Sequence, residues 1–117
     1  MRVSSGAREA VPLSSTTFYI LLSLADADRH GYAISKEVAA LTDGDVLLPP
    51  ATLYRLMKQL LADGWIKEVD LREDDLQRRR SYRLTPRGRE VARAEAARLA
   101  IVVRAAQARN LLPAGAL

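Results

Sequence analysis

One stretch of the chain decides the fold: PATLYRLMKQLLADGWI, from Pro50 to Ile66. Proline suits the first turn of a helix, because its missing N–H would have no partner there. Apolar side chains then recur at helical spacing, and Gly64 stands where glycine commonly ends a helix. The stretch therefore predicts an amphipathic helix. Its apolar residues are Leu53, Leu56, Met57, Leu60 and Leu61, and its polar face offers Thr52, Tyr54, Arg55, Lys58 and Gln59.

A second stretch, RRRSYRLTPRG over residues 78–88, indicates a hairpin that runs into another helix. Residues 65–71 and 79–84 have the composition of two strands, and the polar residues 72–78 between them predict an irregular tip. Thr85 followed by Pro86 is a cap followed by proline, which predicts a helix that continues to about residue 110.

Two shorter helices are predicted upstream of this pair of stretches. The first follows a cap at Ser14 or Ser15 and extends to Leu24, and the second covers residues 32–41. The inward-facing residues of the second helix are predicted to be Ile34, Val38 and Leu41.

The remaining segments predict little regular structure. Residues 26–31 have the composition of a turn, and residues 46–48 suit a short extended piece. Residues 1–13 show no period, so we expect a loose arm there.

The order of elements predicts a mainly α (α+β) fold, a winged helix-turn-helix with a two-stranded wing and one added long helix. We divide the chain into a flexible arm (1–13), a DNA-binding winged helix-turn-helix domain (14–84), a C-terminal dimerisation helix (85–110) and a tail (111–117). At 1.5 Å per residue the last helix is about 37 Å long, more than a small core needs. It either folds back onto its own domain or packs against a two-fold copy, and we expect the second. The predicted dimer interface is Val91, Leu99, Val102, Val103 and Ala106.

The charge is unevenly distributed along the chain. Residues 1–75 hold eight Lys and Arg against twelve Asp and Glu, a net −4, whereas residues 76–117 hold ten Arg against two Glu, a net +8. Such a basic end favours a nucleic acid or an acidic partner, although a merely solvated arginine-rich helix has the same composition.

Composition argues against an enzyme and against a membrane protein. The chain has no cysteine and one histidine, His30, so we expect no catalytic residues, metal site or cofactor. We assign His30 to a turn, and Trp65 to the core between hairpin and helix. No apolar run exceeds five residues, the length of the run over residues 18–22, which is far too short to span a bilayer, and we expect a cytoplasmic protein.

The polar face of the helix after Pro50 suits double-stranded DNA. Cations neutralise phosphates, and donors on a rigid helix reach base edges in the major groove. Arg55 can pair with guanine or with a phosphate, and Lys58 suits a phosphate. Tyr54 either contacts DNA or is half-buried beside Met57.

Two flanking elements extend this predicted contact surface. The helix over residues 32–41 would cross the DNA backbone, and the hairpin arginines would reach a flanking phosphate or the minor groove. The full set of predicted DNA contacts is Tyr32, Ser35, Lys36, Thr52, Tyr54, Arg55, Lys58, Arg78, Arg79 and Arg80.

Four motifs, in this order and spacing, carry a family resemblance. They are HGYAI (30–34), TLYR (52–55), LLADGWI (60–66) and RRSYRLTPRG (79–88). Together they resemble the PadR family of bacterial transcriptional regulators over about residues 15–110.

The resemblance implies a winged helix-turn-helix repressor that dimerises through its C-terminal helix. It implies binding to an inverted-repeat promoter site, and in many members release of the DNA by a small-molecule effector. Tyr32, Thr52, Tyr54 and the wing arginines are implied DNA contacts. The helix that begins at Pro50 is the one expected to read the DNA bases, and we call it the reading helix. At its start this chain has Ala51 where the family usually has glycine, and Pro49 where the family often has a serine cap.

A different class of function also suits the same residues. A winged helix can be a protein-interaction module whose basic face docks an acidic partner. Competition between a palindromic promoter fragment and random duplex distinguishes the two, because a module for acidic partners would bind both equally.

Overall fold

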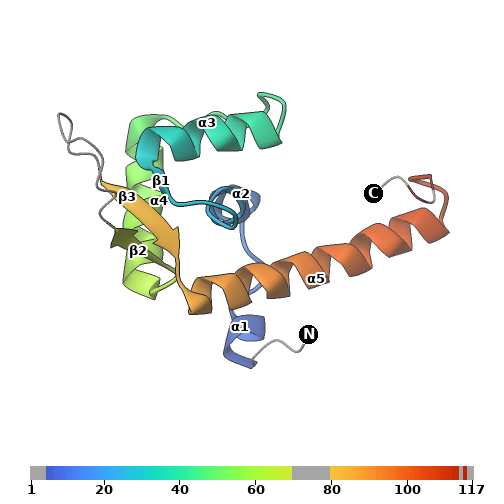
Figure 1. The fold of residues 1–117 in the computed structure, drawn as a ribbon. Coiled ribbons are helices and arrows are strands. Elements are labelled where there is room, and N and C mark those ends of the chain that lie inside the picture. The colour runs from blue at the N-terminus through green and yellow to red at the C-terminus, as the bar shows by residue number, and fades with distance from the viewer. Residues whose placement is uncertain (1–4, 70–79, 114, 116–117) are drawn as a thin grey trace.

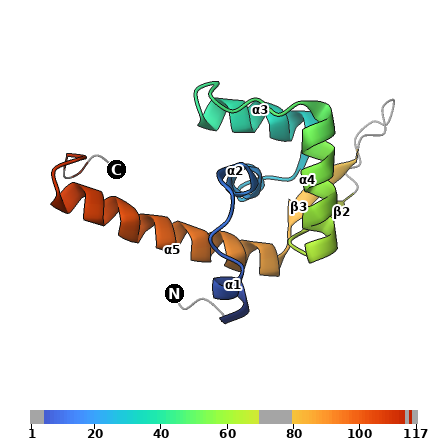
Figure 2. The same ribbon diagram turned by 180° about the vertical axis from the view of Figure 1, so that it is seen from behind.

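The computed structural model describes residues 5–69, 80–113 and 115, and it has the predicted winged-helix architecture (Figures 1 and 2). Within these ranges there are five helices and a small antiparallel sheet that lies at one edge of the fold, and the last helix extends away from the rest. The elements are α1 (Ser5–Glu9), α2 (Ser15–Ser23), β1 (Arg29–His30), α3 (Gly31–Leu41), α4 (Pro50–Asp63), β2 (Ile66–Val69), β3 (Ser81–Leu84) and α5 (Pro86–Ala108).

The predicted helix boundaries are confirmed by their caps. The Ser14 hydroxyl accepts a hydrogen bond from the Thr17 N–H at 3.1 Å, and the Thr85 hydroxyl accepts one from the Gly88 N–H at 3.0 Å. Gly64 ends α4 in the left-handed conformation, with φ of 77°, which glycine adopts without strain. His30 caps α3, since its Nδ1 accepts from the Ala33 N–H at 3.2 Å.

The sheet contains a strand that the sequence does not predict. Its order is β1-β3-β2, with Arg29 opposite Tyr82, and Ile66 opposite Leu84. Strand β1 is two residues long and lies in the segment predicted to be a turn. Its pairing with β3 connects the start of α3 to the wing. Residues 46–48, predicted to be extended, form no strand.

The core lies where α2, α3, α4, the sheet and the first half of α5 meet. Ile34 and Val38 are fully buried as predicted, but Leu41 is 48% exposed because α3 ends there, beyond the core. Trp65 is partly buried and packs against the core, in agreement with its predicted role. The central buried side chains are Ile20, Leu21, Ile34, Val38, Leu53, Met57, Leu60, Ile66, Leu84 and Val91.

The N-terminal segment corrects the expectation of a loose arm. Helix α1 packs against α5 on the opposite side from α2 (Figure 1), and Ala7 is fully buried. The Leu13 N–H donates to Glu95 Oε1 at 3.3 Å. Residues 5–13 therefore belong to the packed structure, held by a helix partner that a local sequence pattern does not reveal.

A tight junction joins the wing to α5. The Thr85 N–H donates to the Trp65 carbonyl at 3.0 Å, and the Thr85 hydroxyl donates to the Gly64 carbonyl at 2.7 Å. A Cβ on Gly88 would overlap the Trp65 carbonyl oxygen. Glycine at this position therefore allows the first turn of α5 to approach the α4–β2 turn.

No helix among the described residues is long and apolar enough to cross a membrane.

Candidate nucleic-acid interface

Helix α4 divides its side chains between the core and the solvent as its sequence predicts. Leu53, Met57 and Leu60 are buried, with Leu56 and Leu61 half-buried behind them. Arg55 and Lys58 are exposed, and Tyr54 is 62% exposed, which favours the contact role for Tyr54 over half-burial. Thr52 is half-buried in the first turn. The polar face of α4 is thus a free cationic surface in this chain.

The entrance of α4 has no side-chain cap. Pro49 precedes the helix and supplies no hydrogen-bonding side chain, and Ala51 is exposed in the first turn. The first N–H groups of α4 therefore have no side-chain acceptor from Pro49.

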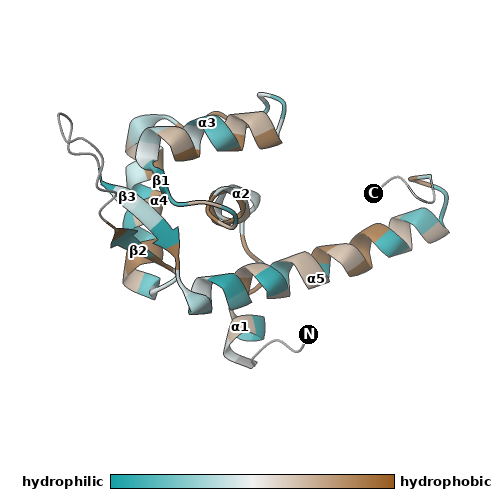
Figure 3. Ribbon diagram, viewed as in Figure 1, coloured by the Kyte–Doolittle hydropathy of each residue, from teal (hydrophilic) through white to brown (hydrophobic). Residues whose placement is uncertain are grey.

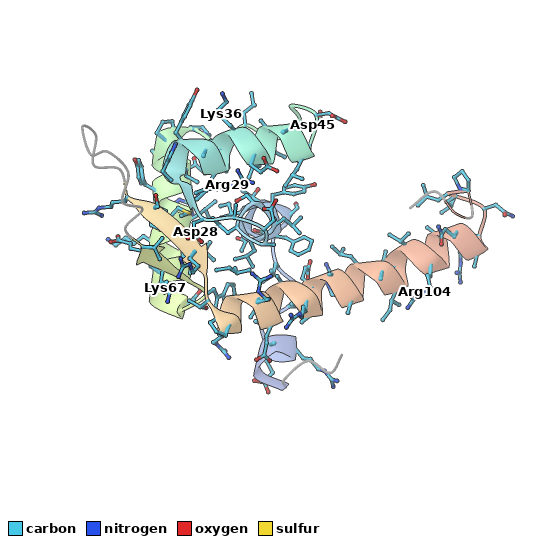
Figure 4. All side chains as sticks on the ribbon, viewed as in Figure 1. Asp28, Arg29, Lys36, Asp45, Lys67 and Arg104 are labelled. Atoms are coloured by element: carbon cyan, nitrogen blue, oxygen red, sulfur yellow. The ribbon has the colours of Figure 1, made fainter. Side chains whose placement is uncertain are left out.

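Helix α3 adds a second exposed group next to the start of α4. Tyr32 is 66% exposed, and Lys36 Nζ lies 5.4 Å from the centre of its ring, a cation–π arrangement. The His30 ring stacks parallel to Tyr32 with the centroids 6.5 Å apart. Lys36 points outward from α3, away from α2 (Figure 4), and Ser35 is half-buried.

The starts of α3 and α4 are in contact. A Cβ on Gly31 would lie 3.7 Å from Leu53 Cδ2. Because Gly31 adjoins Tyr32 and Leu53 adjoins Thr52, the exposed residues of both helices begin at the same place in the fold.

The wing contributes Arg80, at the point where β3 begins. Its side chain is 75% exposed and forms an ion pair with Glu68 of β2, Nη1 to Oε2, at 3.5 Å. The predicted contacts Arg78 and Arg79 lie outside the described residues.

Beneath Arg80 is a nearly buried tyrosine, Tyr82. Burial raises the pKa of Tyr82, and the charge of Glu68 raises that pKa further. The charge of Arg80, together with a hydrogen bond from it, opposes these effects and lowers the pKa of Tyr82. Strand β2, which pairs with β3 beside Tyr82, contacts α4, so the base of the wing adjoins that helix.

An ion pair that the sequence does not predict braces the sheet from the other face. Arg83 donates to both oxygens of Asp28, at 3.1 Å to Oδ1 and 2.8 Å to Oδ2. This hydrogen-bonded pairing lowers the pKa of Asp28. Asp28 and Arg83 are 55 residues apart in sequence, so only the β1–β3 pairing brings them together.

The residues predicted for a dimer interface are in two different situations. Val91 is fully buried in the core of its own chain. It has no surface available to a partner, and it is therefore not kept among the proposed interface residues. Val102 is 53% exposed, and Leu99, Val103 and Ala106 are half-buried. Ile101 is 61% exposed, but at 100° per residue it lies on the opposite side of α5 from Leu99 and Val103. Figure 3 shows apolar residues along this projecting part of α5.

The described residues contain no group of three or more His, Cys, Asp or Glu side chains placed to hold a metal ion. What they do bring together is an exposed tyrosine and cation set from α3, α4 and the base of the wing.

Comparison with known proteins identifies the family. Residues 20–94 match the model of the transcriptional regulator PadR-like family, and no curated protein gives a significant match. The chain therefore belongs to the PadR-like family of transcriptional regulators.

Solved structures have the same fold. The chain is similar to a transcriptional regulator from Clostridium thermocellum, with 27% identity, a TM-score of 0.66 and coverage of 89% of this chain and 94% of that one. A PadR family regulator from Clostridium difficile aligns with a TM-score of 0.69, 21% identity, and coverage of 80% and 96%. Bacillus subtilis PadR, solved in complex with operator DNA, aligns with a TM-score of 0.60, 19% identity, and coverage of 68% of this chain and 45% of that one.

Proposed function

We propose that this chain is a DNA-binding transcriptional repressor that binds an inverted-repeat promoter site as a homodimer. The observation that carries the proposal is the exposed cationic face of α4, with Arg55 and Lys58 on the side opposite its buried leucines. A helix of this kind enters the major groove, where its side chains meet bases and phosphates.

The neighbouring elements support a docking mode for α4. In this proposal Tyr32, Ser35 and Lys36 contact the DNA backbone that α3 crosses, and Thr52 and Tyr54 contact DNA at the start of α4. Arg80 and, on the wing, Arg78 and Arg79 are assigned to a flanking phosphate or the minor groove. The operator complex of Bacillus subtilis PadR is a precedent for DNA binding by a protein of this fold.

The projecting part of α5 supports the homodimer. Leu99, Val102, Val103 and Ala106 recur on one face of the helix at a spacing that a second copy can cover. A two-fold dimer would set two copies of α4 at the fixed separation that an inverted repeat requires. Release of DNA by a small-molecule effector is part of the proposal because the family resemblance implies it.

Binding to a duplex selected from a random-sequence library, compared with random duplex, tests the proposal. The wild-type chain is expected to prefer the selected duplex, and its affinity is expected to fall steeply with salt. Replacing both Arg55 and Lys58 by alanine should lower the affinity about 10-fold or more and reduce the salt slope by about 2.

Arg93→Ala is the matched control, because Arg93 is an exposed arginine on α5. It should change neither affinity nor slope appreciably. Equal affinity for selected and random duplex would instead favour a module for acidic protein partners. Protection mapped on promoter DNA, with and without candidate small molecules, tests the effector.

A further inference from the structure

Arg80 is paired with a carboxylate of its own sheet, Glu68. Glu68 lies opposite Tyr82 in the β2–β3 register, and Arg80 is two residues before Tyr82, so the three share one face of the hairpin. The Glu68 carboxylate reaches Arg80 at 3.5 Å, and the side chains of Arg80 and Glu68 are 75% and 48% exposed. Solvent, and any ligand on this face, therefore reaches both partners of the pair.

A carboxylate in this position opposes DNA in two ways. It occupies part of the guanidinium that a phosphate would bind, and its own charge repels that phosphate. The pair is exposed, so water and salt weaken it, and a phosphate can replace the carboxylate at small cost.

The surroundings distinguish Glu68 from its neighbours. Lys67, the residue before it, is opposite Arg83 in the register and so belongs to the other face of the sheet, where Asp28 holds Arg83. Tyr82, only 4% exposed, lies opposite Glu68 in the register, and strand β2, which carries Glu68, contacts α4. The Glu68–Arg80 pair therefore borders the reading helix, whereas the Asp28–Arg83 pair braces the sheet from behind.

We propose that Glu68 competes with the DNA backbone for Arg80 and thereby limits the grip of the wing. This inference rests on the proposed DNA-binding function. It assigns to β2 a residue that positions Arg80 in the free protein and must give it up when DNA binds. A weaker wing contact leaves more of the discrimination between sequences to α4, because phosphate contacts add affinity without sequence information.

A double-mutant cycle on Glu68 and Arg80 tests the competition. Glu68→Gln removes the charge but keeps the shape, and it should raise affinity for both selected and random duplex by about two- to five-fold. Glu68→Asp keeps the charge and should stay near wild type. In an Arg80→Gln background the gain from Glu68→Gln should shrink to that of Glu9→Gln, a control at an exposed carboxylate on α1.

Salt dependence supplies a second readout that a purely structural role would not change. Arg80→Gln should reduce the salt slope by about 1, and Glu68→Gln should not reduce it. Thermal unfolding of each variant shows whether the fold is intact.

Two results would overturn the inference: an equal gain from Glu68→Gln with and without Arg80, or a loss of affinity on Glu68→Gln in a folded protein. Failure of the wild-type chain to bind any duplex would overturn the proposed function itself. The wild-type titration therefore separates the two failures.

Discussion

The two halves of α5 have the same helical backbone and opposite surroundings. In residues 86–98 the side chains of Val91, Ala94 and Glu95 are buried against α1, α2 and the sheet. In residues 99–108 no residue is buried, although the segment includes Ile101, Val102 and Val103. Figure 1 shows the second half projecting beyond the rest of the fold.

Contacts within one chain account for the position of the first half of α5 but not for the exposed apolar residues of the second half. The first half is fixed by its own domain, through the Thr85 cap, the Gly88 contact and the Glu95 hydrogen bonds. The second half exposes branched apolar side chains that a lone domain would gain by covering, at roughly 25 cal/mol per Å² of apolar area. A second copy of the chain is the partner that we propose for it.

The largest effect is expected from a charge placed on the projecting half of α5, because that half is proposed to pack against a second copy of the chain. Val102→Asp would place a carboxylate in the proposed interface, where it would be buried without a partner. We expect the dimer to weaken on the order of 100-fold or more, and binding to the selected duplex to fall with it. Sedimentation equilibrium and a duplex titration measure the two effects.

Ala97→Asp is the matched control for Val102→Asp. Ala97 is exposed on the same helix and, at 100° per residue, lies on the side away from Val102. It should leave the dimer and the DNA affinity nearly unchanged. A dimer that survives Val102→Asp but dissociates with Ala97→Asp would place the interface on the other side of α5.

The second-largest effect is expected on the stability of the fold, from a substitution in the first half of α5 where this helix joins the wing. Gly88→Ala brings a Cβ against the backbone carbonyl of Trp65, which cannot rotate away as a side chain can. We expect a loss of about 3 kcal/mol in the free energy of unfolding, measured by denaturant titration. Gly31→Ala is the control, since its Cβ meets only Leu53 Cδ2 at an ordinary 3.7 Å. Equal stability of the two variants would contradict the claim that the close approach of α5 to the Trp65 carbonyl requires glycine at position 88.

Local signals in the sequence were enough to predict the four main helices and the hairpin. Caps at Ser14 and Thr85, the Gly64 stop and the apolar spacing of α4 are all properties of neighbouring residues. Strand β1 and helix α1 were missed, because each is short and is held by a partner distant in sequence. Val91 was assigned to an interface because periodicity reveals an apolar stripe but not where along a helix its own core ends.

The candidate site divides in the same way. Exposure of Arg55 and Lys58 follows from the amphipathic pattern of α4, so the sequence predicted it, whereas for Tyr54 the sequence left exposure and half-burial open. The Glu68–Arg80 and Asp28–Arg83 pairs depend on strand register, which the sequence alone left open. Nothing local distinguishes Glu68 from the other acidic residues of the hairpin.

The smallest predicted effect concerns Glu95, which lies near the end of the buried half of α5, and its contribution to stability at low pH. This carboxylate is 1% exposed, and Arg98 donates to it at 2.9 and 2.7 Å. The hydrogen bonds from Arg98, helped by the Leu13 N–H, lower the pKa of Glu95 below its usual value of 4.5. A lowered pKa means that the unfolded chain binds the proton more readily than the folded chain does.

Glu95 therefore contributes stability that is complete at neutral pH and is lost as the pH falls below about 4.5 toward the lower folded pKa. Glu95→Gln should cost about 1 to 2 kcal/mol at pH 7 and flatten the acid limb of the stability curve. Denaturant titrations across the acid range measure both. Glu90→Gln, the same change five residues earlier on α5, is the matched control for the loss of stability at pH 7. If Glu95→Gln leaves the acid limb as steep as wild type, the hydrogen bonds from Arg98 and Leu13 to the Glu95 carboxylate do not stabilise the folded chain.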